Sequence, residues 1–459
     1  MELNDYNNKM DEILNDLTMY RIQRQDLTLK LQNKNNSLVD KLFKMELVSK
    51  KDRNKLTTTT ALPPRIYGLP KIHKKGTPLR PICSATGSPA HALCKYVAYI
   101  LKNVTTSSLY NIKNTQDFKE KINNSYIYDD EKMISFDAVS LFPSIPTNLA
   151  LDIIRNKWTT IEKYTKIPKK MFIEILKFCI KDNRYFKYNE TTYTQLKGLP
   201  MGSPTSPIIA DIVMEELLDN AMNKLARKPR LLTKYVDDLL AIINENVVQN
   251  ILDALNSFDK NIKFITELED DGKLPYLDSI VIRRGNQLKL MWYKKSITSG
   301  RIINYYSKHP KNMIINTAMG CIRRMMNITD DTYHNDIENE INILLKANDF
   351  PDKIIKTLLK RYKSPNSQRR EENPKIIKSL TYVPKLSERL STSDIYNKED
   401  IKIAHKPMST LKSIFNQTKS KIPQMEKSNI IYQIPCNGND KELCNKVYVG
   451  TTKSKLKMI

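Results

Sequence analysis

The sequence has few of the residues that mark secreted or membrane-spanning chains. Its 459 residues include 11 glycines, 2 tryptophans and 6 cysteines, and only Cys436 and Cys444 lie close together along the chain. Scattered cysteines argue against a disulfide framework and are typical of a reducing compartment. No apolar run reaches the roughly 18 residues of a membrane-spanning helix, and no basic, apolar leader opens the sequence. We therefore expect an intracellular protein, nuclear or cytoplasmic, without a membrane partner.

Acidic residues are scarce relative to basic ones. Lysine and arginine number 75 against 50 aspartates and glutamates, which gives a formal charge of +25 and a pI near 9.5. Such an excess predicts binding to a polyanion, with an affinity that falls as salt rises. A chain of this length has room for two or three domains with a substantial core.

Two adjacent aspartates interrupt the most apolar part of the chain. Residues 231–243 read LLTKYVDDLLAII, a pattern that predicts two buried strands joined by a tight turn at Asp237 and Asp238. An unpaired carboxylate is costly in apolar surroundings, so these side chains lie either in a solvated turn or beside cations. A lone pair of aspartates is most often an ordinary hairpin turn. A catalytic interpretation requires a third carboxylate elsewhere.

A third carboxylate follows another apolar segment. Residues 133–146 read MISFDAVSLFPSIP, in which a short predicted strand ends at Asp137 and Phe142 stands five residues beyond it. Taken alone, Asp137 is compatible with a strand-end residue that makes local hydrogen bonds. Three carboxylates gathered on one sheet are instead what two-metal phosphoryl transfer requires. They would hold two Mg²⁺ ions, with Mn²⁺ as a substitute, together with substrate phosphates.

A basic hairpin is predicted ahead of these carboxylates. Residues 65–82 read RIYGLPKIHKKGTPLRPI, in which prolines fix two short extended pieces around a Lys-Lys-Gly-Thr-Pro turn. Lys71 and Arg80 on this arm are suited to gripping a triphosphate or a nucleic-acid backbone. A solvated basic turn explains the pattern equally well.

A glycine-containing loop precedes a predicted helix. Residues 195–218 read QLKGLPMGSPTSPIIADIVMEELL, and Met201 and Gly202 lie where the backbone can approach a flat or charged ligand. Ser206 and Pro207 are a suitable start for the helix that follows. The order of residues is not that of a P-loop, so the loop alone does not identify a phosphate site.

An acid-free segment extends from Ile280 to Thr329. Aromatic side chains are interleaved with its basic ones, which favours a nucleic-acid track over a merely solvated face. The residues predicted to contact the strands are Arg283, Arg284, Trp292, Lys294, Lys295, Arg301, Lys308, Arg323 and Arg324.

Five motifs in this order resemble the reverse transcriptases of Penelope-like retroelements, distant relatives of telomerase. They read YGLPKIHKKGTPLRPI, SFDAVSLFPSIP, GLPMGSPTSP, YVDDLL and LPYLDSIVIRR, and the resemblance extends from about residue 65 to residue 324. It implies an α+β fold: a right-hand polymerase with an antiparallel palm sheet, fingers and a helical thumb. It also implies an RNA-directed DNA polymerase that adds dNTPs to the 3′-OH of a DNA primer on an RNA template.

The resemblance gives roles to residues already singled out. The three aspartates take the catalytic metal positions, and Phe142 matches the aromatic gate that rejects a ribose 2′-OH. Lys71 and Arg80 match the fingers, while Met201 and Gly202 match the loop beside the nucleotide. The acid-free segment corresponds to the primer grip and thumb.

The tail resembles part of a second domain. Residues 431–432 and 448–450 are similar to the two strands that open a GIY-YIG endonuclease, with Cys436 and Cys444 between them. The catalytic glutamate of that domain does not follow, so we expect a remnant without nuclease activity. A DKG-like basic strand that usually opens the family is also missing, and we expect a truncated element copy.

The predicted organisation has five parts. They are a helical N-terminal extension over 1–60, reverse transcriptase fingers and palm over 61–290, a thumb with the basic track over 291–400, a linker over 401–427 and the endonuclease remnant over 428–459. The alternative function is a non-catalytic nucleic-acid-binding remnant. It keeps the basic track and predicts that Asp137→Ala changes nothing measurable.

Overall fold

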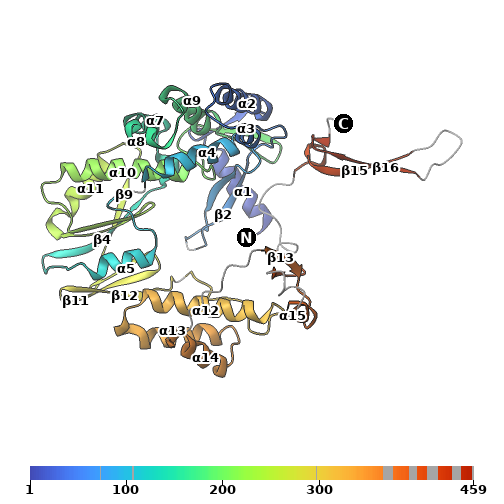
Figure 1. Ribbon diagram of the computed structural model, residues 1–459. Helices are drawn as coiled ribbons and strands as arrows, with labels where there is room; N and C mark the ends of the chain where they lie inside the picture. Colours follow the sequence, from blue (N-terminus) through green and yellow to red (C-terminus); the bar gives the residue numbers. More distant parts are fainter. Residues whose placement is uncertain are drawn as a thin grey trace.

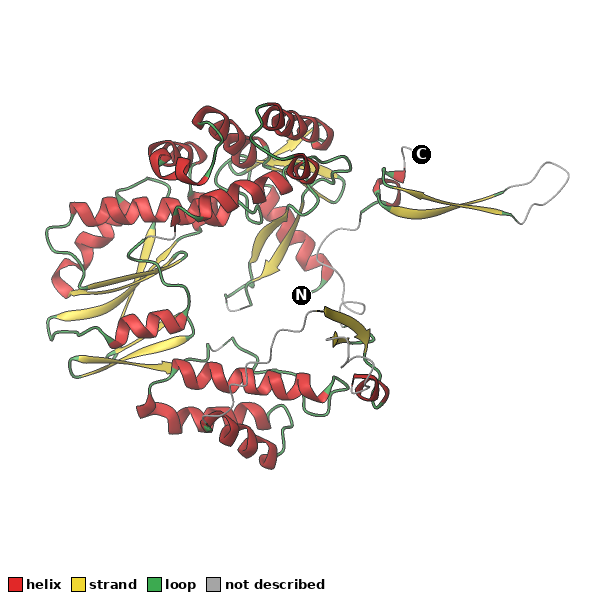
Figure 2. Ribbon diagram, in the orientation of Figure 1, coloured by secondary structure: helices red, strands yellow, loops and turns green. Residues whose placement is uncertain are grey.

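The structure, a computed structural model, describes most of the chain (Figure 1). The described residues are 1–72, 74–105, 108–295, 297–364, 376–391, 401–410, 422–436 and 446–456. Helices and strands are interspersed along the first 364 residues. Figure 2 shows the resulting α+β arrangement. The three parts that the resemblance predicts are the palm, the fingers and the thumb.

The palm is an antiparallel sheet with strand order β7-β8-β4-β9. Its strands are β4 (Glu131–Ala138), β7 (Leu231–Tyr235), β8 (Asp238–Asn244) and β9 (Phe264–Leu268). Leu239, Ala241 and Ile243 of β8 enter the largest hydrophobic core, whereas Leu240 and Ile242 enter a second core on the opposite face. Both faces of β8 are therefore buried, which explains its continuous apolar sequence.

Different elements cover the two faces of the palm (Figure 1). The larger core is completed by helices, among them α4 (His91–Lys102), α7 (Thr147–Asn156), α9 (Lys169–Lys177), α10 (Ser206–Lys224) and α11 (Val248–Asn256). The second core is completed by α5 (Thr115–Asn123) and by the antiparallel sheet β10 (Lys273–Tyr276), β11 (Ser279–Arg284) and β12 (Gln287–Trp292). Two short helices, α6 (Leu141–Ser144) and α8 (Trp158–Ile161), flank α7 in the chain.

The fingers contain a five-stranded sheet with strand order β1-β6-β5-β2-β3. Its strands are β1 (Tyr20–Gln23), β2 (Arg65–Pro70), β3 (Leu79–Ser84), β5 (Tyr185–Tyr188) and β6 (Thr191–Gln195). The segment 1–60, predicted as helical, contains α1 (Leu3–Leu14), α2 (Thr28–Lys44) and α3 (Lys50–Leu56), and it also supplies the edge strand β1. This segment is thus built into the fingers sheet.

Helix α1 supports the hairpin formed by β2 and β3. The hydroxyl of Tyr6 accepts a hydrogen bond of 2.8 Å from the backbone N–H of Gly68, and Lys9 Nζ donates one of 2.7 Å to the carbonyl of Gly76. Met10 and Leu79 pack in the same apolar cluster. The basic arm is therefore held from behind by the first helix.

The thumb is a three-helix unit with its own hydrophobic core. It consists of α12 (Lys311–Ile328), α13 (His334–Lys346) and α14 (Asp352–Lys363). Beyond it, β13 (Ile376–Thr381) and β14 (Ile401–Lys406) pair in parallel, with α15 (Leu386–Ser391) between them in the chain. No helix among the described residues is long and apolar enough to cross a membrane.

The last pair of strands forms a hairpin that extends away from the other elements in Figure 1. It joins β15 (Ile430–Pro435) to β16 (Val447–Thr452) in antiparallel register, with Tyr432 opposite Gly450. Cys436 is exposed, and Cys444 lies outside the described residues. The assignment to a GIY-YIG remnant stays a prediction.

Candidate active site

The turn between β7 and β8 carries the adjacent aspartates. Tyr235 pairs with Asp238, which leaves Val236 and Asp237 as a two-residue loop. Hairpin loops of this length require a positive φ, and Val236 has a φ of 60°. For a β-branched residue this is an unfavourable conformation that persists only where the surrounding structure imposes it. Here the pairing of Tyr235 with Asp238 closes the loop on both sides of Val236.

The third carboxylate lies directly across the sheet. Asp137 of β4 is the register partner of Asp238 of β8. Directly opposed residues share one face of a sheet, with Cβ atoms about 4.5–5.5 Å apart. That face is the one on which Met133 and Ile242 enter the second core. The predicted meeting of carboxylates from distant parts of the chain is thus present in the structure.

The closeness of the carboxylates affects their electrostatics. Burial, followed by the charges of Asp237 and Asp137, raises the pKa of Asp238 to about 6. Burial and the charge of Asp137 also raise the pKa of Asp237, against the opposing effects of its own backbone N–H and of Arg80. A bound cation would stabilise carboxylates that are partly buried and close to one another, because it offsets their mutual repulsion.

The residues present fit a divalent metal that is shared with a substrate. Among the described residues, no group of three His, Cys, Asp or Glu side chains is arranged to hold a metal ion by itself. Mg²⁺ in nucleotide-handling enzymes is usually bound by one or two carboxylates together with phosphate oxygens. The opposed pair Asp137 and Asp238, with Asp237 beside it, supplies such a partial set of hard oxygen ligands.

Cations approach the carboxylates from two sides. From the fingers, the charge of Arg80 opposes the rise in the pKa of Asp237, and the charge of Asp137 opposes the fall in the pKa of Lys71. Burial, then the positive charges of Arg80 and the neighbouring Lys74, lowers the pKa of Lys71. From the loop after β12, the charge of Lys295 acts on Asp238. Substrate phosphates would therefore meet positive charge on both sides.

The glycine loop is fixed between the fingers and α6. Gly202 has a φ of 109°, and a Cβ atom at this position would lie 2.0 Å from the carbonyl oxygen of Cys83 in β3. The N–H of Cys83 in turn donates to the carbonyl of Met201 at 2.7 Å. Three residues before Gly202, the N–H of Leu199 donates to the carbonyl of Phe142 at 2.8 Å. The loop thus links the basic arm to the half-buried aromatic residue assigned as the gate.

A groove of about 720 Å³ leads away from the carboxylates. It is lined by residues from the palm, from the start of α5, from the turn between β10 and β11, and from α12. They include Asn114, Gln116, Tyr235, Asp238, Leu277, Asp278, Lys295, Arg324 and Asn327. The groove therefore connects the active-site face of the palm with the thumb.

The residues of the predicted basic track differ in whether their side chains are bonded within the protein. Arg283 is committed to the protein, because it pairs with Glu269 at 3.2 Å and donates to the backbone carbonyl of Glu131 at 3.0 Å. Arg284 contacts the Tyr333 hydroxyl. The track residues whose side chains are exposed and form no ion pair among the described residues are Lys294, Lys295, Arg301, Lys308 and Arg323. Trp292 is half-buried, and Arg324 pairs with Asp278 at the groove.

A buried charge cluster behind the palm was not predicted. The Lys234 side chain is fully buried in β7 and forms an ion pair with Asp211 of α10. Glu215, one helical turn further on, accepts a hydrogen bond of 2.8 Å from Asn111. Burial, then the charge of Asp211, raises the pKa of Glu215 to about 7. A lysine within an otherwise apolar strand was the available signal, but its partners lie in distant segments.

The arrangement of fingers, palm and thumb around opposed carboxylates is a right-hand polymerase fold. Comparison with family models agrees: residues 72–269 match the one described as "Reverse transcriptase (RNA-dependent DNA polymerase)", and residues 301–360 match "Animal helix-turn-helix domain". Residues 72–269 are therefore similar to a reverse transcriptase domain, the kind of domain that catalyses RNA-directed DNA synthesis. The predicted fold class is confirmed, and the match over residues 72–269 agrees with the predicted enzyme class.

The chain is also similar to solved polymerase structures. Telomerase from Candida albicans in complex with a fragment of telomeric RNA has 11% identity and a TM-score of 0.45, covering 75% of this chain and 64% of that one. Apo telomerase from Candida tropicalis, truncated from its C-terminal domain, has 16% identity and a TM-score of 0.39, with coverage of 56% and 60%. The BmCPV RNA-dependent RNA polymerase at elongation state has 11% identity and a TM-score of 0.41, with coverage of 74% and 31%.

The chain spans less than two thirds of the length of these telomerase chains. A comparison with curated proteins finds no match.

Proposed function

We propose that this chain is the RNA-directed DNA polymerase of a retroelement. It extends a DNA primer on an RNA template by adding dNTPs to the primer 3′-OH. The observation that supports this most directly is the register of Asp137 opposite Asp238, with Asp237 beside them and a groove leading from the site to the thumb. A merely structural acidic turn would not need a third carboxylate on the neighbouring strand.

The proposed chemistry requires divalent ions that Asp137, Asp237 and Asp238 would hold. When bound, two Mg²⁺ ions would supply charge stabilisation to the attacking 3′-oxygen and the leaving pyrophosphate. Arg80 and Lys71 bind the triphosphate from the fingers side, since both already act on the carboxylates electrostatically. Their positions neutralise the charge of the incoming nucleotide and orient it toward the primer end.

The nucleotide pocket is completed by the glycine loop and by Phe142. The contacts of Gly202 with Cys83 and of Leu199 with Phe142 hold the loop beside the site. Phe142 follows Asp137 through a sharp turn, in which Ser140 has a φ of 51°. We assign Phe142 as the residue that discriminates against the ribose 2′-OH.

The subtype is a Penelope-like element, supported by the order and wording of the five motifs. The terminal hairpin belongs to the same proposal, as the start of a GIY-YIG endonuclease. In its support, the antiparallel pairing of β15 and β16 sets Tyr432 opposite Gly450.

Primer extension tests the proposal. With Mg²⁺ or Mn²⁺, the protein should extend a DNA primer on an RNA template. Asp137→Asn should lower kcat by about 10²–10³-fold or more while leaving primer–template affinity within a factor of a few. Asp271→Asn is the matched control, because Asp271 lies in an exposed turn and pairs only loosely with Lys273 at 3.7 Å.

Two results would contradict the proposal. One is equal extension by the wild-type protein and by Asp137→Asn. The other is absence of extension by a folded protein that still binds primer–template, which is the behaviour of a non-catalytic remnant.

A further inference from the structure

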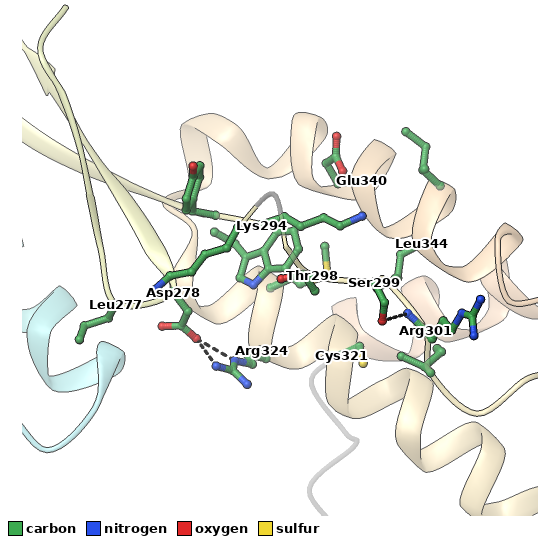
Figure 3. Close-up of a pocket in the computed structure, with 17 residues that line it drawn as sticks. Leu277, Asp278, Lys294, Thr298, Ser299, Arg301, Cys321, Arg324, Glu340 and Leu344 are labelled. Atoms are coloured by element: carbon green, nitrogen blue, oxygen red, sulfur yellow. Dashed lines mark hydrogen bonds and ion pairs between the residues drawn. The ribbon is translucent and has the colours of Figure 1, made fainter. Parts of the chain in front are cut away.

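A pocket of about 370 Å³ lies between the loop after β12 and helices α12 and α13 (Figure 3). Its apolar wall is formed by Trp292, Ile302, Cys321, Met325 and Leu344. Trp292 is the last residue of β12, and its backbone N–H donates to the Thr329 hydroxyl at 2.9 Å. An aromatic ring system thus faces an open space from a strand end whose backbone is fixed.

Charged side chains surround this apolar wall. The cations are Lys294, Lys295, Arg301 and Arg324, and the carboxylates are Asp278 and Glu340. Lys294, Lys295 and Arg301 form no ion pair among the residues that the structure describes, whereas Arg324 Nε donates to Asp278 at 2.8 Å. Figure 3 shows Lys294 extending across the pocket and Arg324 meeting Asp278 at its edge. The entrance therefore has an excess of free positive charge.

The pocket adjoins the groove that leads from the carboxylates. Leu277, Asp278, Lys295 and Arg324 line both spaces. Asp238 lines the far end of the groove, where the proposed function places the primer 3′-OH. A strand whose end leaves the active site along the groove would meet the pocket next.

We propose that this pocket binds a single unpaired nucleotide at the 3′ end of the primer. The base stacks on Trp292, and the phosphate is bound by Lys294 or Arg301. The proposal rests on the proposed function, because it needs a primer end at Asp238. It goes beyond polymerisation by assigning a place where a mispaired end is held away from the carboxylates.

The dimensions and chemistry of the pocket favour this ligand over two others. Its volume is at the low end of the roughly 300–1,000 Å³ of small-ligand sites, so it admits one nucleotide and excludes a duplex. A free phosphate would leave the apolar wall without a partner. An aromatic face bordered by cations is the combination that binds single-stranded nucleic acid, and paired bases do not expose their faces to it.

The two tryptophans of the chain make the test direct. Trp158 packs against Phe172 in the large core, away from this pocket, so Trp158→Phe leaves Trp292 as the sole indole reporter. A primer with a mismatched 3′-terminal nucleotide should quench its fluorescence, and the matched primer on the same template should not. We expect the protein to bind the mismatched primer–template as tightly as the matched one, or up to about tenfold more tightly because of stacking on Trp292.

Filling the pocket should abolish the difference in Trp292 quenching between mismatched and matched primers. Cys321→Phe places a ring against the apolar wall and should remove the mismatch-dependent quenching. Thr317→Phe, one turn earlier on the same helix, adds the same ring outside the pocket and should preserve the quenching. Equal quenching by matched and mismatched primers, or none by either, overturns the proposal.

Failure of this inference and failure of the proposed function are distinguishable. Extension of a fully matched primer by Trp158→Phe reports polymerisation alone. A protein that extends matched primers but shows no mismatch-dependent quenching retains the proposed function and lacks the proposed pocket role.

Discussion

At the scale of single residues, the site includes positive φ angles, which residues with a Cβ atom rarely adopt. Val236 holds a positive φ in the turn that presents the two aspartates. Such a conformation costs roughly 1–3 kcal/mol, which the buried strand β8 offsets. The pairing of Tyr235 with Asp238 closes this loop, and Asp238 lies opposite Asp137 across the sheet.

Gly202 is the residue at which a methyl group should be least tolerated. Because its φ is 109° and a Cβ atom would overlap the carbonyl of Cys83, Gly202→Ala must displace the loop from β3. We expect a loss of about 2–4 kcal/mol of unfolding free energy and a raised KM for dNTPs. Gly76→Ala is the control, because it also has a positive φ but nothing lies within 4 Å of its Cβ position. Equal effects of the two substitutions in thermal melting would contradict this account.

Phe142→Ala should relax sugar discrimination. Removing the ring leaves room for a 2′-OH beside the incoming nucleotide, so the ratio of kcat/KM for rNTPs to that for dNTPs should rise by about tenfold or more. The rate with dNTPs should change less than this ratio. Single-nucleotide incorporation with paired rNTP and dNTP substrates measures both. An unchanged ratio would remove the assigned role.

At the scale of elements, the ion pair between Lys234 and Asp211 joins β7 to α10. Breaking a buried pair leaves an uncompensated charge, so Lys234→Met should cost about 3–5 kcal/mol of unfolding free energy. Because β7 leads into the aspartate turn, kcat should fall while the KM for dNTPs changes little. Replacing both partners, as Lys234→Met with Asp211→Leu, should restore much of the stability in urea unfolding. Additive losses in this double-mutant cycle would show that the two side chains act independently.

Glu215 on the same helix should make stability depend on pH. Its folded-state pKa of about 7 lies above the usual value of a glutamate. The contribution of its neutral form is therefore complete below about pH 4.5 and is lost as pH rises through 7. Glu215→Gln keeps an oxygen that accepts the hydrogen bond from Asn111, but its amide side chain cannot ionise.

We expect the unfolding free energy of Glu215→Gln relative to wild type to increase by about 1–3 kcal/mol between pH 5 and pH 8. Urea unfolding at several pH values measures this difference, with Glu12→Gln at an exposed position as the control. A difference that does not vary with pH would contradict the assigned cause.

At the scale of the whole molecule, the excess of 25 positive charges predicts binding that weakens with salt. Arg323 is exposed on α12, so Arg323→Ala should reduce the slope of log K against log salt by about 0.7–0.9 without changing stability. Arg283 is instead paired with Glu269, so Arg283→Ala should lower the unfolding free energy by about 3 kcal/mol and leave the slope unchanged. If Arg283→Ala instead reduced the salt slope without lowering the unfolding free energy, Arg283 would be a nucleic-acid contact.

The sequence predicted those strands whose apolar residues are consecutive along the chain. The apolar runs around Asp137 and around Asp237 indicated strands, and β4 and β8 lie there. The charge partners of Lys234 and Arg283 could not be predicted, because Asp211 and Glu269 reach them only through tertiary packing. Strand β1 was missed for a similar reason: its sequence YRIQ is short and half polar, and only its partner strand makes it a strand.

Because β6, the partner of β1, comes much later in the sequence, the pairing affects how the chain folds. Strand β1 pairs with β6, so that Tyr20 lies opposite Gln195, and about 170 residues must be synthesised between them. During translation the first strand emerges from the ribosome well before the sheet edge that receives it exists. Loop closure over such a span is slow, so completion of the fingers should be a late step in folding. A bulky fusion placed close to β1 would interfere with this docking more than one attached beyond the thumb.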